Sequence, residues 1–282
     1  MFLFLVLSGA VFFGAWLIIE PRFFRIVRKE ARCAKLINPL QILHLSDIHF
    51  AYLDRKLASF FDRLAELNPD LIVLTGDIID CREGVYEAEK QLSKLKSKSG
   101  IFAVMGNHDY YDYRLYDCLF HNFQGQRHPL KRNGTLKLRG VYKKLRIKEL
   151  RNESQSVEID GQQIGIHGVD DPVTGHADLT RLRVQKNPGM PHILLSHSLD
   201  VLFGLSEHEI DICFSGHTHG GQVCLPGWGA IITHSRAGRK YASGIKKFMN
   251  IQCCISRGMG SSRFMPIRFF SRPEAILLTL KP

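Results

Sequence analysis

The chain of 282 residues is 45% hydrophobic and 23% charged, a size and composition that allow one large domain with a buried core plus a small additional segment. Its net charge of +11 favours an acidic partner, such as an anionic lipid, a nucleotide or a nucleic acid. The seven cysteines are odd in number and match no zinc spacing, which argues against a disulfide scaffold or a zinc module and predicts reduced thiols in a reducing compartment.

The N-terminal segment Phe2–Ile19 has no charged residue and is followed by a basic flank. A secretory signal peptide carries its basic residues before the apolar run, so the order here is reversed. We expect residues 1–19 to form a hydrophobic membrane anchor, which crosses the bilayer or inserts shallowly because it is short for a span of about 20 residues. A buried N-terminal helix is the alternative. Residues 20–39 would form a basic juxtamembrane segment on an anionic membrane surface, and the positive-inside rule places the following domain in the cytoplasm.

From Gln41 onward, short apolar runs alternate with helical patterns. The runs Gln41–Ser46, Leu71–Thr75 and Ile101–Met105 predict buried strands, and helices are expected near Asp54–Leu67 and Val85–Lys98. Alternating strands and helices of this length predict an α/β fold with a parallel sheet and right-handed crossovers.

The segment Gln124–Lys148 contains many basic residues and no acidic one. Leucines and aromatic residues are interleaved with the cations, which favours a basic lid that grips phosphate or lies on lipid headgroups. In that case Lys143 and Lys144 are candidate contacts for the substrate. The alternative is a solvated basic loop.

The C-terminal half resembles the second half of a sandwich. A hairpin is predicted over Val157–Asp160 and Gln163–His167, and strands over Ile193–Leu195 and Ile212–Phe214, with two more strands, near Ile251–Ile255 and Ala275–Leu280, to complete the sheet.

The stretch Arg257–Arg272 interleaves aromatic residues with arginines. It is expected either to pack against the sheet edge or to form an apolar, cationic rim beside a binding site. The rim hypothesis makes Arg257, Arg263 and Arg268 candidate substrate contacts.

Five of the predicted strands are followed directly by side chains that bind metals. These side chains belong to Asp47, His49, Asp77, Asn107, His108, Asp109, His197, His217 and His219. Ligands of open α/β sheets bind outside the carboxyl ends of the strands, so we expect these side chains to converge. The set has oxygen and nitrogen donors but no thiolate, which favours Mn²⁺, Fe or Zn²⁺ over Ca²⁺. It exceeds the needs of one ion; two ions need a bridging carboxylate, and Asp77 after its glycine turn is the candidate.

The motifs Gly106–Asp109 and Gly216–His219 resemble, in order and spacing, the signature of the calcineurin-like metallophosphoesterases. The resemblance covers roughly Leu40 to the C-terminus and implies a four-layer αββα sandwich over residues 40–282, with two divalent metal ions. Mn²⁺ is the expected metal, with Mg²⁺, Fe or Zn²⁺ as alternatives.

The resemblance also implies a role for each site residue. Asp47, His49 and His219 would hold the first metal, Asp77 would bridge, and Asn107, His197 and His217 would hold the second. His108 would stabilise or protonate the leaving group, with Asp109 orienting its ring. His167 and His192 compete with His197 for the role of ligand.

The stretch from Gly216 to Gln222 and the ending Phe264–Ser271 are similar to a membrane-associated bacterial subgroup of this family, the YaeI/YkuE-like proteins. One branch, found in chlamydiae, hydrolyses the diphosphate of UDP-2,3-diacylglucosamine in lipid A synthesis. That similarity implies a lipid-linked nucleotide diphosphate as substrate and a location at the cytoplasmic face of the inner membrane. A broad-specificity phosphodiesterase and a non-catalytic metal-bound membrane scaffold are the alternatives. No nucleic-acid-binding motif is present, so nucleic acid is not expected as a partner.

Overall fold

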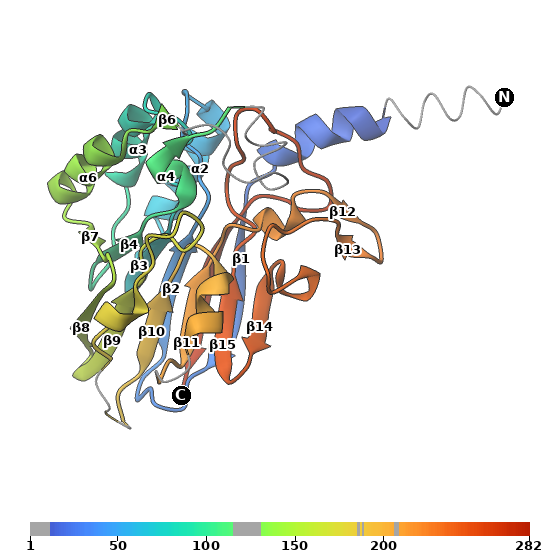
Figure 1. Cartoon of the computed structure of the whole chain (residues 1–282). Coiled ribbons are helices and arrows are strands. Elements are labelled where there is room, and N and C mark those ends of the chain that lie inside the picture. Colours follow the sequence, from blue (N-terminus) through green and yellow to red (C-terminus); the bar gives the residue numbers. More distant parts are fainter. Residues whose placement is uncertain (1–11, 115–130, 185–186, 188, 206–208) are drawn as a thin grey trace.

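The computed structural model of the chain describes residues 12–114, 131–184, 187, 189–205 and 209–282 (Figure 1). Its strands form two six-stranded sheets. The first sheet has the order β1 (Arg25–Arg32), β16 (Glu274–Lys281), β2 (Leu40–Leu45), β3 (Leu71–Thr75), β4 (Ile101–Val104) and β7 (Lys148–Glu149). The second has the order β14 (Gly244–Phe248), β15 (Ile251–Ile255), β11 (Ile212–Ser215), β10 (His192–Leu195), β9 (Gln162–Gly168) and β8 (Glu153–Ile159). The central strands β2, β3 and β4 run parallel, as do β9, β10, β11 and β15.

The central strands are buried on both faces, which explains their continuous apolar sequences. In β3, Leu71 and Val73 point into the core between the two sheets, whereas Ile72 and Leu74 pack under the helices. Side chains alternate between the faces of a strand, so each strand contributes to two cores at once. From the second sheet, Ile166, Ile193 and Ile212 complete the inner core.

Helices cover the first sheet, and short 3₁₀ helices cover the second. The helices are α2 (Arg55–Ala65), α3 (Gly84–Leu92) and α6 (Thr135–Lys144), with the single turn α4 (Asn107–Tyr110) at the end of β4. The outer face of the second sheet packs against η2 (Leu179–Arg181), η3 (Leu199–Gly204) and neighbouring loops. The two inner β layers agree with the expected sandwich, but in the described chain the layer outside the second sheet is made of 3₁₀ helices and loops.

Three further 3₁₀ helices and two small hairpins lie outside these layers. They are η1 (Glu20–Arg22), η4 (His219–Gly221) and η5 (Arg239–Tyr241), and the strand pairs β5 (Tyr111–Asp112) with β6 (Lys131–Arg132) and β12 (Cys224–Leu225) with β13 (Gly229–Ala230). The six described cysteines are free and buried.

The two sequence-terminal strands correct the predicted organisation. The C-terminal strand β16 does not complete the second half of the sandwich; it inserts between β1 and β2 of the first sheet. Its residues Ile276, Leu278 and Leu280 fill the core between the sheets, and Leu277 packs on the helix side. The sheet also includes β1, which pairs with β16 along all its residues, so the domain begins at Arg25 rather than at residue 40.

The basic segment 124–148 is only partly described, since residues 124–130 lie outside the described chain. Residues 131–148 form β6, α6 and β7, and α6 buries Leu138, Val141 and Tyr142 in the core over the first sheet. These three apolar residues between the cations are therefore the inner face of a packed helix, and a lid is not confirmed.

The predicted membrane anchor is also only partly described, since residues 1–11 lie outside the described chain. Residues 12–19 are helical and lead into η1. Within the described residues, none of the helices combines the length and apolarity that a membrane span requires.

Candidate metal centre

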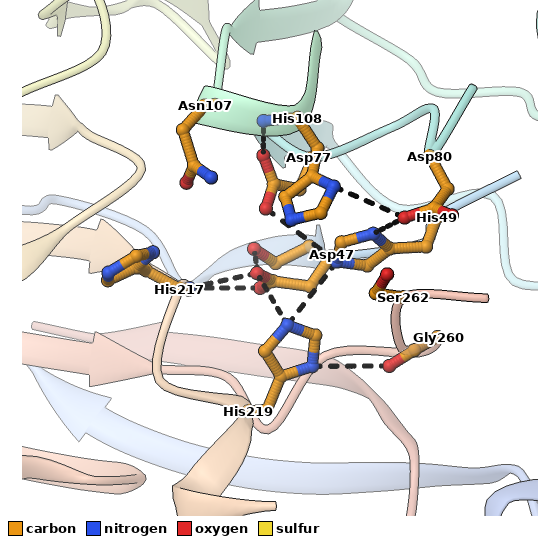
Figure 2. A network of polar contacts seen from close by, with 12 residues as sticks. Asp47, His49, Asp77, Asp80, Asn107, His108, His217, His219, Gly260 and Ser262 are labelled. Carbon is orange, nitrogen blue, oxygen red and sulfur yellow. Dashed lines mark hydrogen bonds and ion pairs between the residues drawn. The ribbon is translucent and has the colours of Figure 1, made fainter. Parts of the chain in front are cut away.

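The predicted ligands converge at one edge of the two sheets, where five strands end. Asp47 and His49 follow β2, Asp77 follows β3, Asn107 begins α4 after β4, and the remaining histidines follow β10 and β11. Backbone hydrogen bonds tie these strand ends together: Asp47 N–H donates to the Gly76 carbonyl oxygen and Gly216 N–H to that of His197. Figure 2 shows the carboxylates of Asp47 and Asp77 between the histidines.

The backbone is strained at five of these ligands. Asp47, His49, Asp77, His217 and His219 all have positive φ angles, between +49° and +68°. For residues other than glycine this left-handed conformation costs on the order of 1–2 kcal/mol each. Such strain persists where surrounding structure holds it, and it gathers at functional sites.

The first group of donors contains Asp47, His49 and His219. Nε2 of His49 lies 3.3 Å from Nε2 of His219, which lies 3.6 Å from Oδ1 of Asp47. The three side chains can hold one metal ion between them.

The second group contains Asn107, His197 and His217. Nε2 of His197 lies 3.2 Å from Oδ1 of Asn107 and 3.2 Å from Nδ1 of His217. Oδ2 of Asp77 lies 3.3 Å from Nε2 of His197 and 3.6 Å from Nε2 of His49, so it stands between the two groups. This is the position that a bridging carboxylate occupies.

The far ring nitrogens of the histidines determine which atoms face the centre. Nδ1 of His197 lies 2.8 Å from the carbonyl oxygen of Thr75, and Nδ1 of His219 lies 3.2 Å from that of Gly260. A carbonyl only accepts, so Nδ1 of His197 carries the proton and its Nε2 presents a lone pair. Nδ1 of His219 also lies 3.2 Å from Nη2 of Arg268, which only donates. Nδ1 of His49 likewise donates to a carboxylate, that of Asp80, at 3.1 Å. Nε2 of His49 therefore presents its lone pair toward the ring of His219.

The two competing histidines lie elsewhere in the second sheet. Nε2 of His167 pairs with Nδ1 of His192 at 3.0 Å, and Nδ1 of His167 pairs with Ser154. Among the described residues, the metal-ligand groups include His197 but neither of these two.

Glycines allow the close approach of the ligand loops. A Cβ atom at Gly216 would lie 2.1 Å from Oδ2 of Asp47, and one at Gly106 would lie 2.3 Å from Oδ1 of Asp77. Both distances are far inside van der Waals contact, so only glycine fits. The crowded, oxygen- and nitrogen-lined site fits a pair of divalent cations.

The donor set of this site and the sequence of the chain together identify the protein family. Residues 40–221 match the calcineurin-like phosphoesterase family. The chain is a calcineurin-like metallophosphoesterase. Members of this family are metal-dependent hydrolases of phosphoesters, and they bind two divalent metals.

Several relatives of this metallophosphoesterase match along most of their lengths. The uncharacterized metallophosphoesterase YkuE of Bacillus subtilis is 32% identical, over 84% of this chain and 76% of its own. The UDP-2,3-diacylglucosamine pyrophosphatase LpxG of Chlamydia muridarum is 28% identical, over 92% of this chain and 90% of its own. The phosphodiesterase YaeI of Escherichia coli is 27% identical, over 95% of this chain and 92% of its own.

Asp80 is a site residue of the metallophosphoesterase that the sequence analysis missed. Its Oδ1 lies 3.2 Å from Nδ1 of His108 and 3.1 Å from Nδ1 of His49. The expected partner of His108, Asp109, instead accepts hydrogen bonds from the backbone N–H groups of Ile78, Ile79 and Gly106. Asp109 therefore braces two loops, and Asp80 orients the ring of His108. The available signal was a second carboxylate three residues after Asp77 on the same loop.

The pKa shifts report strong pairing within the site. Burial works against the charged forms of Asp77 and His197, but contacts between them lower the pKa of Asp77 and raise that of His197. Burial likewise opposes the charge on Asp80, yet the adjacent rings of His108 and His49 lower its pKa. At His108, burial lowers the pKa and the carboxylates of Asp77 and Asp80 raise it by more.

The five candidate substrate contacts fall in different places. Arg257 lies near the surface, but Arg268 is fully buried and donates to the carbonyl oxygens of Ser271 and Gly260. Arg263 is committed to Asp80 and Asp112.

The lysine candidates lie at the far end of α6. Thr135, at the start of α6, contacts the site by donating to the carbonyl oxygen of Asp109. Lys143 and Lys144 come roughly 13 Å further along the helix axis, where Lys144 pairs with Glu89 of α3. Arg268 is therefore corrected from a substrate contact to a structural residue, because it is buried and bonded to backbone carbonyls. Lys143 and Lys144 stay predictions.

Proposed function

We propose that this metallophosphoesterase hydrolyses UDP-2,3-diacylglucosamine to UMP and 2,3-diacylglucosamine 1-phosphate, at the cytoplasmic face of the inner membrane. The observation that carries the proposal is an exposed apolar and cationic surface beside the metal centre. It includes Phe12, Phe13 and Phe270 with Arg257 and Arg272. A purely nucleotide substrate gives no role to such a surface, whereas a substrate with two acyl chains does. The similarity to the chlamydial pyrophosphatase, over nine-tenths of both chains, supports the same substrate class.

The reaction breaks one P–O bond of the diphosphate. When bound, two divalent cations supply a hydroxide at neutral pH and offset the charge on the phosphoryl oxygens. Asp47, His49, Asp77, Asn107, His197, His217 and His219 would hold them. The oxygen of water ends on one phosphorus, and the other phosphate leaves with the bridging oxygen.

His108 would supply the proton to the leaving oxygen. Its ring is held by Asp80 on one side and stacks near Tyr113 on the other, with ring centroids 4.6 Å apart. The carboxylates of Asp77 and Asp80 raise its pKa against the effect of burial, which is the direction that a general acid requires. Its side chain is 13% exposed, so it reaches the opening of the site.

The decisive experiment compares two substrates with detergent-solubilised full-length protein. UDP-2,3-diacylglucosamine and an aryl phosphodiester are each tested with Mn²⁺, Mg²⁺ or EDTA, and products are separated by chromatography. We expect metal-dependent release of UMP, with strong preference for the acylated substrate, and no turnover in Asp77→Ala. Turnover of the aryl diester without UMP release would reject the lipid substrate.

A broad-specificity phosphodiesterase remains the second candidate. It is favoured by the placement of the metal ligands, which come from strand ends of the two sheets and need no contribution from the N-terminal helix. Such an enzyme would hydrolyse the aryl diester and short nucleotide diesters equally well with and without acyl chains. The non-catalytic scaffold finds no support, since the family consists of hydrolases.

A further inference from the structure

We infer that the N-terminal helix and the loop after Arg268 together form a binding site for one acyl chain with its anionic headgroup. The inference rests on the proposed function, because the lipid substrate would supply that chain. A cavity of about 520 Å³ lies between these two segments. This volume is within the range of about 300–1,000 Å³ of pockets that bind small molecules.

The walls of the cavity are aromatic. Phe12, Phe13 and Trp16 come from the helix, and Phe269 and Phe270 come from the loop. The rings of Phe13 and Phe269 meet edge to face with centroids 4.7 Å apart, as do those of Phe269 and Phe270. Phe12 is 69% exposed and Phe270 56% exposed, so the walls present apolar surface that nothing in the described chain covers. An acyl chain is the ligand that such walls would bury.

Three arginines line the same cavity. Arg25 pairs with Glu274 at 2.9 Å, and Nε of Arg257 lies 3.8 Å from the same carboxylate. Arg272 has no carboxylate partner in the contacts of the described chain; its guanidinium lies 5.8 Å from the ring centroid of Phe23. Guanidinium groups recognise phosphate through paired N–H donors, so an anionic headgroup fits this end of the cavity.

The one carboxylate that lines the cavity is already satisfied. Glu20 is buried and accepts hydrogen bonds from the backbone N–H groups of Phe270 and Ser271, at 2.9 and 2.7 Å. It also accepts from the indole N–H of Trp16 at 2.6 Å. Glu20 therefore fastens the helix to the loop and does not compete with an anionic ligand for the arginines.

The cavity is linked to the metal centre by two hydrogen bonds. The hydroxyl of Ser271 donates to the carbonyl oxygen of His219 at 2.7 Å, and Arg268 donates to the carbonyl oxygen of Ser271 at 2.8 Å. Ser271, which supports the backbone of His219, thus lies in the chain between Phe270 and Arg272, two residues that line the cavity.

Quenching of Trp16 fluorescence tests the site directly. The chain has two tryptophans, so the full-length protein is prepared as Trp228→Phe, leaving Trp16 as the only reporter. The probe is lysophosphatidate with a brominated acyl chain, added below its critical micelle concentration. Phe13→Ser removes a wall, and Ile18→Ser is the matched control, because Ile18 is 59% exposed on the same helix and does not line the cavity.

We expect saturable quenching. Phe13→Ser should weaken the apparent affinity by about tenfold, because it removes an aromatic wall that would bury the acyl chain. Ile18→Ser should leave the apparent affinity unchanged. A brominated monoacylglycerol, which lacks the phosphate, should bind more weakly than brominated lysophosphatidate. Non-saturable quenching, or equal weakening by both variants, would mean that the helix only adheres to lipid and would overturn the inference.

Kinetics separate this site from the proposed function. Phe13→Ser should raise the KM for UDP-2,3-diacylglucosamine, whereas Ile18→Ser, outside the cavity, should leave that KM unchanged. If the protein releases no UMP but brominated lysophosphatidate still quenches Trp16 saturably, the proposed substrate fails and the lipid site stands. If UMP is released without such quenching, the lipid site fails and the proposed function stands.

Discussion

At the scale of single residues, the loop after β3 and the turn α4 after β4 assign different tasks to three carboxylates. Asp77 stands between the two donor groups, Asp80 orients His49 and His108, and Asp109 binds backbone N–H groups. Only Asp77 is placed to contact a metal. The function of the other two depends on which hydrogen-bond donors they meet, which makes the role of Asp80 testable by substitution.

Replacing Asp80 should lower activity without removing the metal ligands. In Asp80→Asn we expect kcat/KM for an aryl diester to fall roughly 10–100-fold, the usual loss when a partner that orients metal-bound histidines is replaced. Asp112→Asn is the matched control, since Asp112 contacts Arg263 but no histidine of the site. Steady-state kinetics with saturating Mn²⁺ measure kcat/KM for both variants. Equal losses of kcat/KM in Asp80→Asn and Asp112→Asn would contradict the orienting role of Asp80.

The glycine before His217 should be irreplaceable even by alanine. The added methyl group of Gly216→Ala would overlap Ser46 and Asp47, so we expect loss of bound metal and of activity. Gly140→Ala is the control: it lies within α6 with open space around it, and alanine there should stabilise the helix by about 0.5–1 kcal/mol. Metal content by mass spectrometry and thermal unfolding measure the two effects. Retention of two metals per chain in Gly216→Ala would refute the packing argument.

At the scale of elements, Glu20 connects the N-terminal helix with the loop that supports His219. A glutamine at position 20 has the same size as the glutamate, but its amide N–H group would face the N–H donors from which the carboxylate accepts. We expect Glu20→Gln to lower the free energy of unfolding by about 1–3 kcal/mol, the cost of unsatisfied buried polar groups. It should also weaken Mn²⁺ binding, because Ser271 would no longer hold the His219 backbone in place.

A charge-matched control isolates that effect. Glu30 on β1 pairs only with Lys281 at the surface, so Glu30→Gln should change neither quantity. Urea unfolding and Mn²⁺ titration of activity measure both variants. An unfolding free energy unchanged in Glu20→Gln would show that the helix is not fastened through this carboxylate.

At the scale of the whole molecule, a buried histidine between the sheets makes stability depend on pH. His44 donates to or accepts from Thr75 at 2.8 Å and meets Phe214 of the opposite sheet edge to face. Burial lowers its pKa to about 3, from about 6.5 for an exposed histidine. Between these values the unfolded chain binds a proton that the folded chain does not, so stability rises with pH.

His44→Gln should therefore reduce the acid sensitivity of the protein. From pH 5.5 down to pH 4 we expect the wild type to lose about 1.4 kcal/mol more per pH unit than the variant. Urea unfolding in EDTA across pH 4–8 measures the difference in unfolding free energy between the wild type and the variant. The metal ligands titrate in both proteins, so their contribution cancels in this difference. Above pH 7 the difference in unfolding free energy between the two proteins should not change with pH. If the unfolding free energy of His44→Gln falls as steeply as that of the wild type below pH 6, His44 is excluded as the source of the acid sensitivity.

The apolar surface extends beyond the cavity to the β12–β13 hairpin. The hairpin is bridged to Phe269 through Val223, and with the N-terminal helix it lies on the side of the molecule opposite α6 (Figure 1). Trp228 at its tip is 67% exposed and packs beside Arg239. Exposed aromatic and cationic side chains of this kind bind anionic membrane surfaces.

Vesicle binding tests this surface. With vesicles rich in anionic phospholipid, Trp228→Ser should reduce co-sedimentation, whereas Leu136→Ser on α6, where the leucine is 82% exposed, should not. Binding should also weaken as salt is raised, since cations screen the attraction. Equal binding by the two variants would place the membrane contact elsewhere.

Sequence alone determined the strands and the ligands at their ends, because both are local features. A buried parallel strand needs a continuous apolar run, and the ligand motifs follow such runs directly, so β3 and β15 were predicted with the bounds observed. The convergence of Asp47, Asp77 and His217 also followed, since parallel strands bring their carboxyl ends to one edge.

Tertiary structure alone decided what depends on partners distant in the chain. The sequence of β16 suits either sheet, and only its pairing with β1 and β2 places it in the first. His197 and His167 both follow apolar runs, and only the carbonyl of Thr75 shows which ring presents a lone pair to the centre. The apolar N-terminal segment is predicted to be a membrane anchor or a buried helix, and only the hydrogen bonds of Glu20 with residues some 250 positions away show that its helix is a wall of a cavity. Local pattern identifies which side chains are apolar or can bind metal, but long-range contacts determine what each of them faces.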